Sequence, residues 1–84
     1  MKPLDFQKKV GQKVKTARAK AGLSQQKAAG LAISLRGYQK IENGESNIRI
    51  QSLFEIGRNL GVHPKIFLDF DIDWFGFLVD GFIT

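Results

Sequence analysis

The chain has 84 residues, and its 13 lysines and arginines against eight acidic residues give a formal charge of +5 at pH 7. A chain of this length forms one domain with a modest core, and it is too small for a second lobe or a deep enzyme cleft. The sequence contains no cysteine and a single histidine. Disulfides and thiolate metal sites are therefore excluded, and we expect neither a metal nor a cofactor.

The first ten residues, MKPLDFQKKV, lack the apolar core of a signal peptide. No apolar run in the sequence reaches the length of a membrane span. We therefore expect a soluble cytoplasmic protein without a membrane partner.

The charge is distributed unevenly along the chain. Residues 1–40 contain ten lysines and arginines against one acid, a balance of +9, whereas residues 41–84 contain three against seven acids, a balance of −4. A one-sided basic half is typical of a protein with a polyphosphate partner. Lysine-rich helices can also be mere solvated faces, so composition alone leaves both interpretations open.

Residues 4–21 place apolar side chains three and four positions apart, which is the period of one helical face. Asp5 stands near the start, where the helix dipole favours an acid, and Gly22 follows the last periodic residue as a C-cap does. The pattern predicts a helix over residues 4–21.

Two serines, each suited to cap a helix, predict the next two helices. Ser24 precedes a short run rich in small residues, which we expect to be helical to about Leu31. Residues 31–33 are expected to form a turn, after which Ser34 caps a helix over residues 34–43 that ends at Asn43-Gly44.

The apolar spacing from Ile48 predicts a fourth helix that Gly61 ends, with its inner face formed by Ile50, Leu53, Phe54, Ile56 or Gly57, and Leu60. Pro64 at a first helical position predicts a short fifth helix to about Leu68. We expect His63, just before it, to have a capping or surface role.

The segment after residue 66 contains five of the seven phenylalanines and the only tryptophan. Residues 70–74 alternate apolar and acidic side chains, which favours a half-buried strand, although helical spacing also fits in part. The sequence thus predicts an all-α, five-helix domain over residues 1–68. We expect residues 69–84 to be an aromatic and acidic extension, with a β-strand as its preferred conformation.

Three segments together resemble the Cro/repressor-type, or XRE, helix-turn-helix family over about residues 8–68: VGQKVKTARAKAGLSQ, ISLRGYQKIENG and NIRIQSLFEIGRNLGVHPKIF. The resemblance implies five packed helices, a dimer on a roughly palindromic operator and no enzymatic activity. Two features depart from the family pattern. The spacing from Ile41 back to Ser24-Gln25 is one residue short, and the usual turn glycine falls on Ala32, which requires a strained turn or a different turn geometry.

The resemblance implies that the helix over residues 34–43 faces the major groove of DNA. Arg36 suits guanine, Gln39 suits adenine and Leu35 suits a thymine methyl group. Arg36 and Lys40 could instead only solvate the helix. Gly37 inside this helix has two explanations, a close approach to DNA or a simple helix defect. The predicted base contacts are Ser34, Leu35, Arg36, Gln39 and Lys40.

Other roles also follow from the resemblance. We interpret Arg18 and Glu42 as a structural ion pair between helices rather than as DNA contacts. Tyr38 is expected in the core, with its hydroxyl reaching the edge of the domain or a phosphate. The predicted phosphate contacts are Gln25, Lys27, Asn47, Arg49 and Lys20.

The aromatic segment has two interpretations. Phe67, Phe70 and Trp74 could close the base of the core, or the apolar residues could form an interface. We favour dimerisation through Phe67, Phe70, Ile72, Trp74 and Phe75.

The main functional hypothesis is a sequence-specific transcriptional regulator, most simply a repressor, that binds a palindromic double-stranded DNA operator as a homodimer. The alternative is an antitoxin or protein-interaction module whose aromatic tail binds a partner protein.

Overall fold

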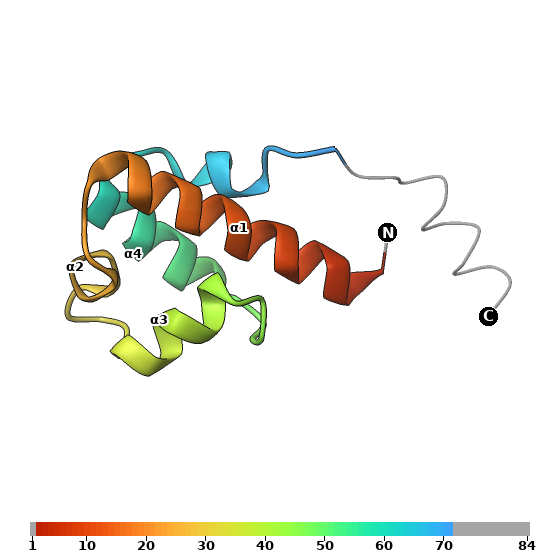
Figure 1. Ribbon diagram of the computed structural model, residues 1–84, viewed down its shortest axis with the longest axis horizontal. Helices are drawn as coiled ribbons and strands as arrows, with labels where there is room; N and C mark the ends of the chain where they lie inside the picture. Colours follow the sequence, from red (N-terminus) through yellow and green to blue (C-terminus); the bar gives the residue numbers. More distant parts are fainter. Residues whose placement is uncertain (1, 72–84) are drawn as a thin grey trace, which may run out of the picture.

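The computed structural model describes residues 2–71, and in this part of the chain it contains four α-helices and one 3₁₀-helix (Figure 1). The predicted all-α class is confirmed for these residues. The elements, in chain order, are α1 (Pro3–Ala21), α2 (Gln25–Ala29), α3 (Leu35–Glu42), α4 (Ile50–Leu60) and η1 (Pro64–Leu68).

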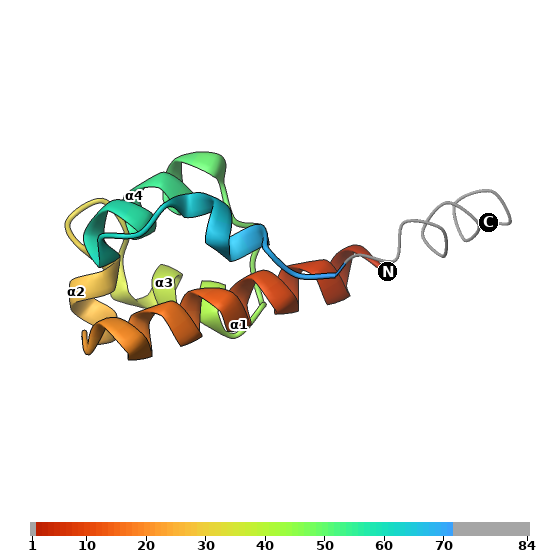
Figure 2. The same cartoon turned by 90° about the horizontal axis from the view of Figure 1, so that it is seen from above.

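The helix α1 runs along the length of the fold, and the other elements pack on one side of it (Figures 1 and 2). Its buried residues are Val10, Gly11, Val14 and Ala17, which recur at the three- and four-residue spacing seen in the sequence. The helix ends at Gly22 in the left-handed conformation, with φ of 70°, as predicted.

The core lies between α1 and the other elements, and α2 contributes Ala28 and Ala29 to it. All five elements contribute, so the core forms only when residues from both ends of the described chain meet. Its largest fully buried side chains are Tyr38, Phe67, Ile56, Val10 and Val14.

The predicted fifth α-helix is instead a five-residue 3₁₀-helix, η1, which lies beside α1 and α4 (Figure 2). Gly61 ends α4 with φ of 72°, and Pro64 starts η1 directly afterwards. So short a segment between a helix stop and Asp69 favours the tighter 3₁₀ turn. His63 caps η1, since its Nδ1 accepts a hydrogen bond from the Lys65 backbone N–H at 3.0 Å. The strand predicted over residues 70–74 lies outside the described residues from position 72 onward.

Two predictions about α4 were wrong. The helix begins at Ile50 rather than Ile48, and Ile50 and Phe54 point mostly to solvent, with 86% and 55% of their surface exposed. The buried face is centred on Leu53, Ile56, Gly57 and Leu60. On a helical wheel Ile50 and Phe54 fall at one edge of that face, which explains why spacing alone assigned them to the core.

Candidate nucleic-acid interface

The helix α3 has one buried and one exposed face. Ser34 caps it, because its Oγ accepts a hydrogen bond from the Gly37 backbone N–H at 3.0 Å. Tyr38, Ile41 and Glu42 are buried beneath it. This spacing leaves the other side of the helix to solvent. All five side chains predicted to contact bases are exposed there: Ser34, Leu35, Arg36, Gln39 and Lys40.

Gly37 lies close to the serine that caps α3. A Cβ at this position would lie 3.0 Å from the Ser34 Oγ, which is tighter than an ordinary contact. The cap does not require glycine, however, because Ser24 caps α2 in the same way with Lys27 at the matching position.

The turn between α2 and α3 is made possible by Gly30. The helix α2 ends at Ala29 rather than near Leu31, because Gly30 adopts φ of 65° and ψ of −152°, a conformation that other residues rarely reach. Among the described residues no non-glycine residue has a positive φ, so the turn has a different geometry and Ala32 is not strained. The end of α2 is held by Asn59 of α4, whose Nδ2 donates to the Ala28 carbonyl at 2.8 Å.

The depth of α3 in the fold is set by Gly11 of α1. A Cβ there would lie 2.8 Å from the backbone carbonyl oxygen of Glu42, and it would collide with that of Ile41. The two helix backbones therefore touch where α3 ends. The sequence signal was a glycine inside an otherwise regular helical pattern, and its role was missed because α3 is far along the chain.

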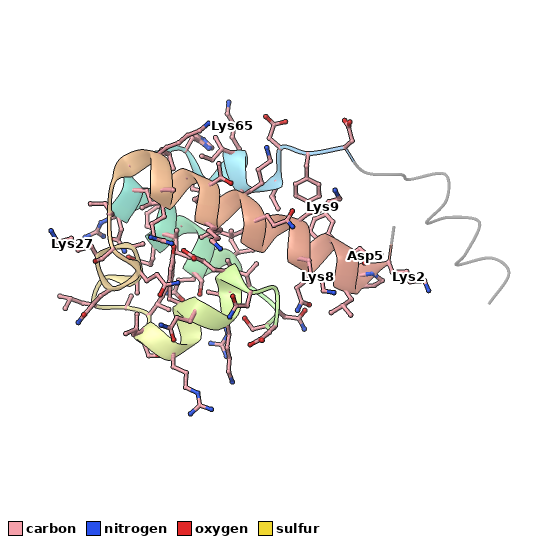
Figure 3. The ribbon with its side chains drawn as sticks, in the orientation of Figure 1. Lys2, Asp5, Lys8, Lys9, Lys27 and Lys65 are labelled. Carbon is pink, nitrogen blue, oxygen red and sulfur yellow. The ribbon has the colours of Figure 1, made fainter. Side chains whose placement is uncertain are left out.

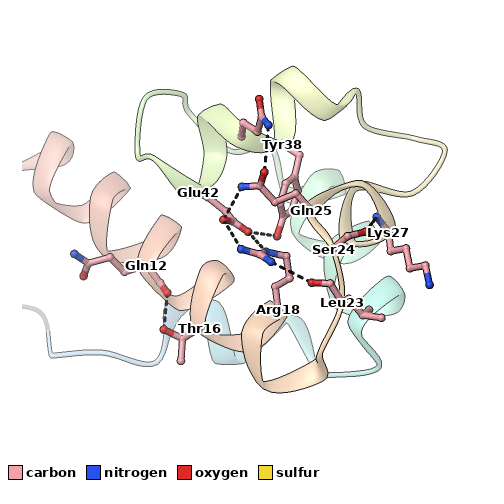
Figure 4. Close-up of polar contacts among 10 residues, drawn as sticks. Gln12, Thr16, Arg18, Leu23, Ser24, Gln25, Lys27, Tyr38 and Glu42 are labelled. Atoms are coloured by element: carbon pink, nitrogen blue, oxygen red, sulfur yellow. Dashed lines mark hydrogen bonds and ion pairs between the residues drawn. The ribbon is translucent and has the colours of Figure 1, made fainter.

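The predicted ion pair between α1 and α3 is present (Figure 4). The Arg18 guanidinium donates from Nε to Glu42 Oε2 at 2.6 Å and from Nη2 to Oε1 at 3.3 Å. Its Nη1 donates to the Leu23 carbonyl at 3.1 Å. The Arg18 side chain is 19% exposed and the Glu42 side chain 1%. This fork geometry ties α1, the loop before α2 and the end of α3 together.

Glu42 accepts two further hydrogen bonds (Figure 4). The Tyr38 hydroxyl donates to Oε2 at 2.5 Å, and Gln25 Nε2 donates to Oε1 at 3.1 Å. The prediction that the Tyr38 hydroxyl reaches the domain edge or a phosphate was therefore wrong. The ring is fully buried, and the charged carboxylate inside the fold holds the hydroxyl.

These contacts shift three pKa values. Burial alone would raise the pKa of the Glu42 carboxyl, but the hydrogen bonds from Arg18, Tyr38 and Gln25 outweigh it and lower that pKa. Burial, and then the hydrogen bond to Glu42, raise the pKa of the Tyr38 hydroxyl. The hydrogen bond to Glu42 raises the pKa of Arg18. The Glu42 carboxylate therefore stays ionised at neutral pH and continues to accept the hydrogen bonds that join α1, α2 and α3.

Gln25 connects this buried cluster to the exposed face of α3. Its Oε1 accepts a hydrogen bond from Gln39 Nε2 at 3.2 Å, while its own Nε2 donates to Glu42. The side chain predicted to contact phosphate is therefore half-buried and engaged on both sides. The spacing of residues in the sequence could not reveal the hydrogen bond between Gln25 and Gln39, because the two residues lie on different helices.

The other predicted phosphate contacts, Lys27, Arg49, Lys20 and Asn47, are exposed. Lys27 projects from α2 away from the fold (Figure 3). Arg49, just before α4, lines an open hollow of about 130 Å³ together with Ala32 and Ile33, so it lies next to the turn that leads into α3. Lys20, in the last turn of α1, and Asn47, in the loop before α4, are also exposed.

Only two of the residues predicted for dimerisation can be placed. The Phe67 side chain is completely buried in the core of its own chain, so it has no surface to offer a partner in this conformation. Phe70 is half-buried and packs edge-on against Phe6, with ring centroids 5.3 Å apart. The other three, Ile72, Trp74 and Phe75, lie outside the described residues.

Within residues 2–71, no cluster of three metal-ligating side chains is present. No helix in that same range is long and apolar enough to cross a membrane.

Searches of curated proteins and of solved structures found no similar chain. A family model described as helix-turn-helix matches residues 14–67, which span α2, α3, α4, the C-terminal part of α1 and nearly all of η1. This match covers more than half of the chain and includes every described residue that we predicted to contact DNA. The chain therefore belongs to the Cro/C1-type (XRE) helix-turn-helix family of DNA-binding transcription regulators.

Proposed function

We propose that this regulator is sequence-specific and that it reads DNA by placing the exposed face of α3 in the major groove. The observation that carries the proposal is the division of α3 into two faces. Tyr38, Ile41 and Glu42 fix the helix to the core, while the polar and charged side chains of the other face are free to contact a ligand. A helix presented in this way fits the width of the major groove.

The side chains on this face suit the edges of particular bases. Arg36 can donate two hydrogen bonds to guanine O6 and N7, and Gln39 can pair with adenine N6 and N7. Leu35, which is 41% exposed, offers an apolar contact for a thymine methyl group. Ser34 and Lys40 complete the proposed base-reading set.

The exposed cations around α3 are proposed to hold the DNA backbone. Lys27, Arg49 and Lys20, with the amide of Asn47, lie on elements that flank α3. Contacts of this kind position a protein on the duplex without reading its sequence. They also make affinity fall with salt, because binding releases counterions.

Arg36→Ala and Lys27→Ala separate these two roles. On a duplex that the parent binds selectively, we expect Arg36→Ala to lose about 1–3 kcal/mol of binding free energy and to relax the preference for one base pair. Lys27→Ala should weaken all sequences alike and make the salt dependence shallower by about one charge. Binding titrations at several salt concentrations measure both. If Arg36→Ala binds every duplex as tightly as the parent, α3 is not the reader.

We further propose that the protein acts as a homodimer on a palindromic operator and represses transcription there. Residues 69–84 are proposed as the dimerisation extension, because they concentrate aromatic side chains while carrying acids at positions 69, 71, 73 and 80. Such acids disfavour contact with DNA and leave the aromatic surface for a protein. A two-fold dimer would present two copies of α3 to two half-sites.

Deleting residues 72–84 tests the dimer. We expect the truncated chain to remain folded but to sediment as a monomer, with operator affinity reduced and half-site contacts retained. Analytical ultracentrifugation and binding to full and half operators measure this. A truncated chain that remains a dimer with full operator affinity would instead favour a tail that binds a different protein, as an antitoxin's tail does.

A further inference from the structure

The hydrogen bonds that link Arg18 to Gln39 converge on Glu42, which accepts from Arg18 on one side and from Gln25 on the other. An ionised carboxylate can only accept hydrogen bonds, so Glu42 requires Gln25 to turn its amide nitrogen toward it. That orientation leaves the Gln25 oxygen on the other side, where it accepts from Gln39 Nε2 at 3.2 Å. Gln39 must therefore turn its nitrogen inward as well. In the described part of the chain, every buried polar side-chain atom has a hydrogen-bond partner.

We propose that Glu42 and Gln25 are positioning residues that fix the donor and acceptor order of the Gln39 amide, and thereby select adenine at the base pair that Gln39 reads. This inference rests on the proposed function, because it assumes that α3 faces bases. It goes beyond that function by assigning specificity to two side chains that need not touch the DNA.

The preference for adenine follows from the hydrogen-bonding groups of the Gln39 amide that Gln25 does not occupy. With one N–H committed to Gln25, its amide presents one free oxygen and one free N–H. Adenine offers a donor at N6 and an acceptor at N7, which match that pair. A Gln39 turned the other way would present only its NH₂ group. That group matches the two acceptors of guanine, O6 and N7.

Two substitutions at Gln25 test this order. Gln25→Met keeps the length of the side chain but removes both polar atoms, so Gln39 becomes free to rotate. We expect adenine preference at one base pair to fall by at least about 5-fold, while the preferences at other positions stay unchanged. Gln25→Lys places an ammonium group between Glu42 and Gln39. The Gln39 oxygen should then turn inward, and the preference should move toward guanine.

Gln26→Met is the matched control. Gln26 is the neighbouring residue on α2 and is exposed, so it has the same chemistry without the link to Glu42. We expect this control to retain the parent's base preferences. Thermal unfolding of each variant checks that the domain is intact before its DNA preferences are compared.

Selection of bound duplexes from a random pool gives the readout. A change confined to one base pair in the Gln25 variants supports the inference, since a merely structural role would weaken all sequences equally. Gln25→Met and Gln25→Lys proteins that keep the parent's preferences, or that lose affinity uniformly, would overturn it.

A second measurement needs no variant and no DNA. In the free parent protein, nuclear Overhauser contacts should place the Gln39 side-chain NH₂ beside Gln25, with slowed exchange of its protons. A freely rotating Gln39 amide would overturn the inference even if the parent selects a DNA sequence. A parent that selects no sequence would refute the proposed function instead, whatever the state of the amides.

Discussion

Replacing Glu42 by glutamine is expected to lower the free energy of unfolding by about 3 kcal/mol. The change removes the negative charge that accepts hydrogen bonds from Arg18, Tyr38 and Gln25. It also leaves the Arg18 guanidinium without an anionic partner. The partial exposure of Arg18 keeps the effect at the lower end of the range for breaking a buried pair. Chemical denaturation at neutral pH measures the loss.

The same substitution predicts a pH dependence. Because the pKa of Glu42 is lowered in the folded protein, its contribution to stability is fully present above the unfolded value of about 4.3. The contribution is lost as the pH falls through the lowered native pKa. The stability difference between the parent and the Glu42→Gln variant should therefore be constant near neutral pH and shrink in acid.

Glu45→Gln is the control for this experiment. Glu45 is an exposed carboxylate in the loop after α3, and its replacement should change stability by no more than about 0.5 kcal/mol. A Glu42→Gln protein as stable as this control, or a difference that grows in acid, would mean that the ion pair does not stabilise the fold.

Replacing Phe67 by alanine is expected to cost about 3–5 kcal/mol of stability, because it removes one of the largest fully buried side chains in the core. In a domain of this size such a loss unfolds a large fraction of the molecules at ordinary temperature. Denaturation curves of parent and variant, each at several protein concentrations, measure the effect.

The concentration series separates a core residue from an interface residue. Leu68→Ala is the matched control, since Leu68 is the next residue and is 43% exposed, and it should cost much less. If the loss in Phe67→Ala appeared only at concentrations where the chain dimerises, with monomer stability unchanged, Phe67 would be an interface residue after all.

The local parts of the fold could be predicted because their causes are local. Ser24 and Ser34 accept hydrogen bonds from backbone groups three residues later, and Gly22 and Gly61 take the left-handed conformation at helix ends. Each signal needs only its own neighbours in the sequence. Helix starts and stops were therefore mostly placed within two residues.

Tertiary contacts decided the rest. Gly30 was not recognised as the turn residue, and the position of α3 against α1 depends on Gly11, which is distant in the sequence from its contacts Ile41 and Glu42. The hydroxyl of Tyr38 was predicted to reach the domain edge or a phosphate, and the family resemblance implied that Gln25 contacts phosphate. Both groups donate hydrogen bonds to the buried carboxylate of Glu42, and the spacing of residues in the sequence does not reveal such contacts.

The exposure of the five predicted residues of α3 agrees with the sequence analysis, which took them from the family resemblance. The burial of Tyr38 and Ile41 on the other side of the helix agrees with the apolar pattern. What the sequence did not reveal is that one of those exposed residues, Gln39, is joined to the interior. The candidate site therefore combines a surface that follows from periodicity with an orientation that follows from packing.

Selection of bound sequences by the parent chain from random duplex DNA tests the central claim most directly. Our account predicts a motif of two related half-sites in inverted orientation, with centres one helical turn or a multiple of it apart, and with guanine and adenine among the fixed bases of each half. A pool that stays random after repeated selection, despite tight salt-sensitive binding, would contradict the claim that α3 reads bases.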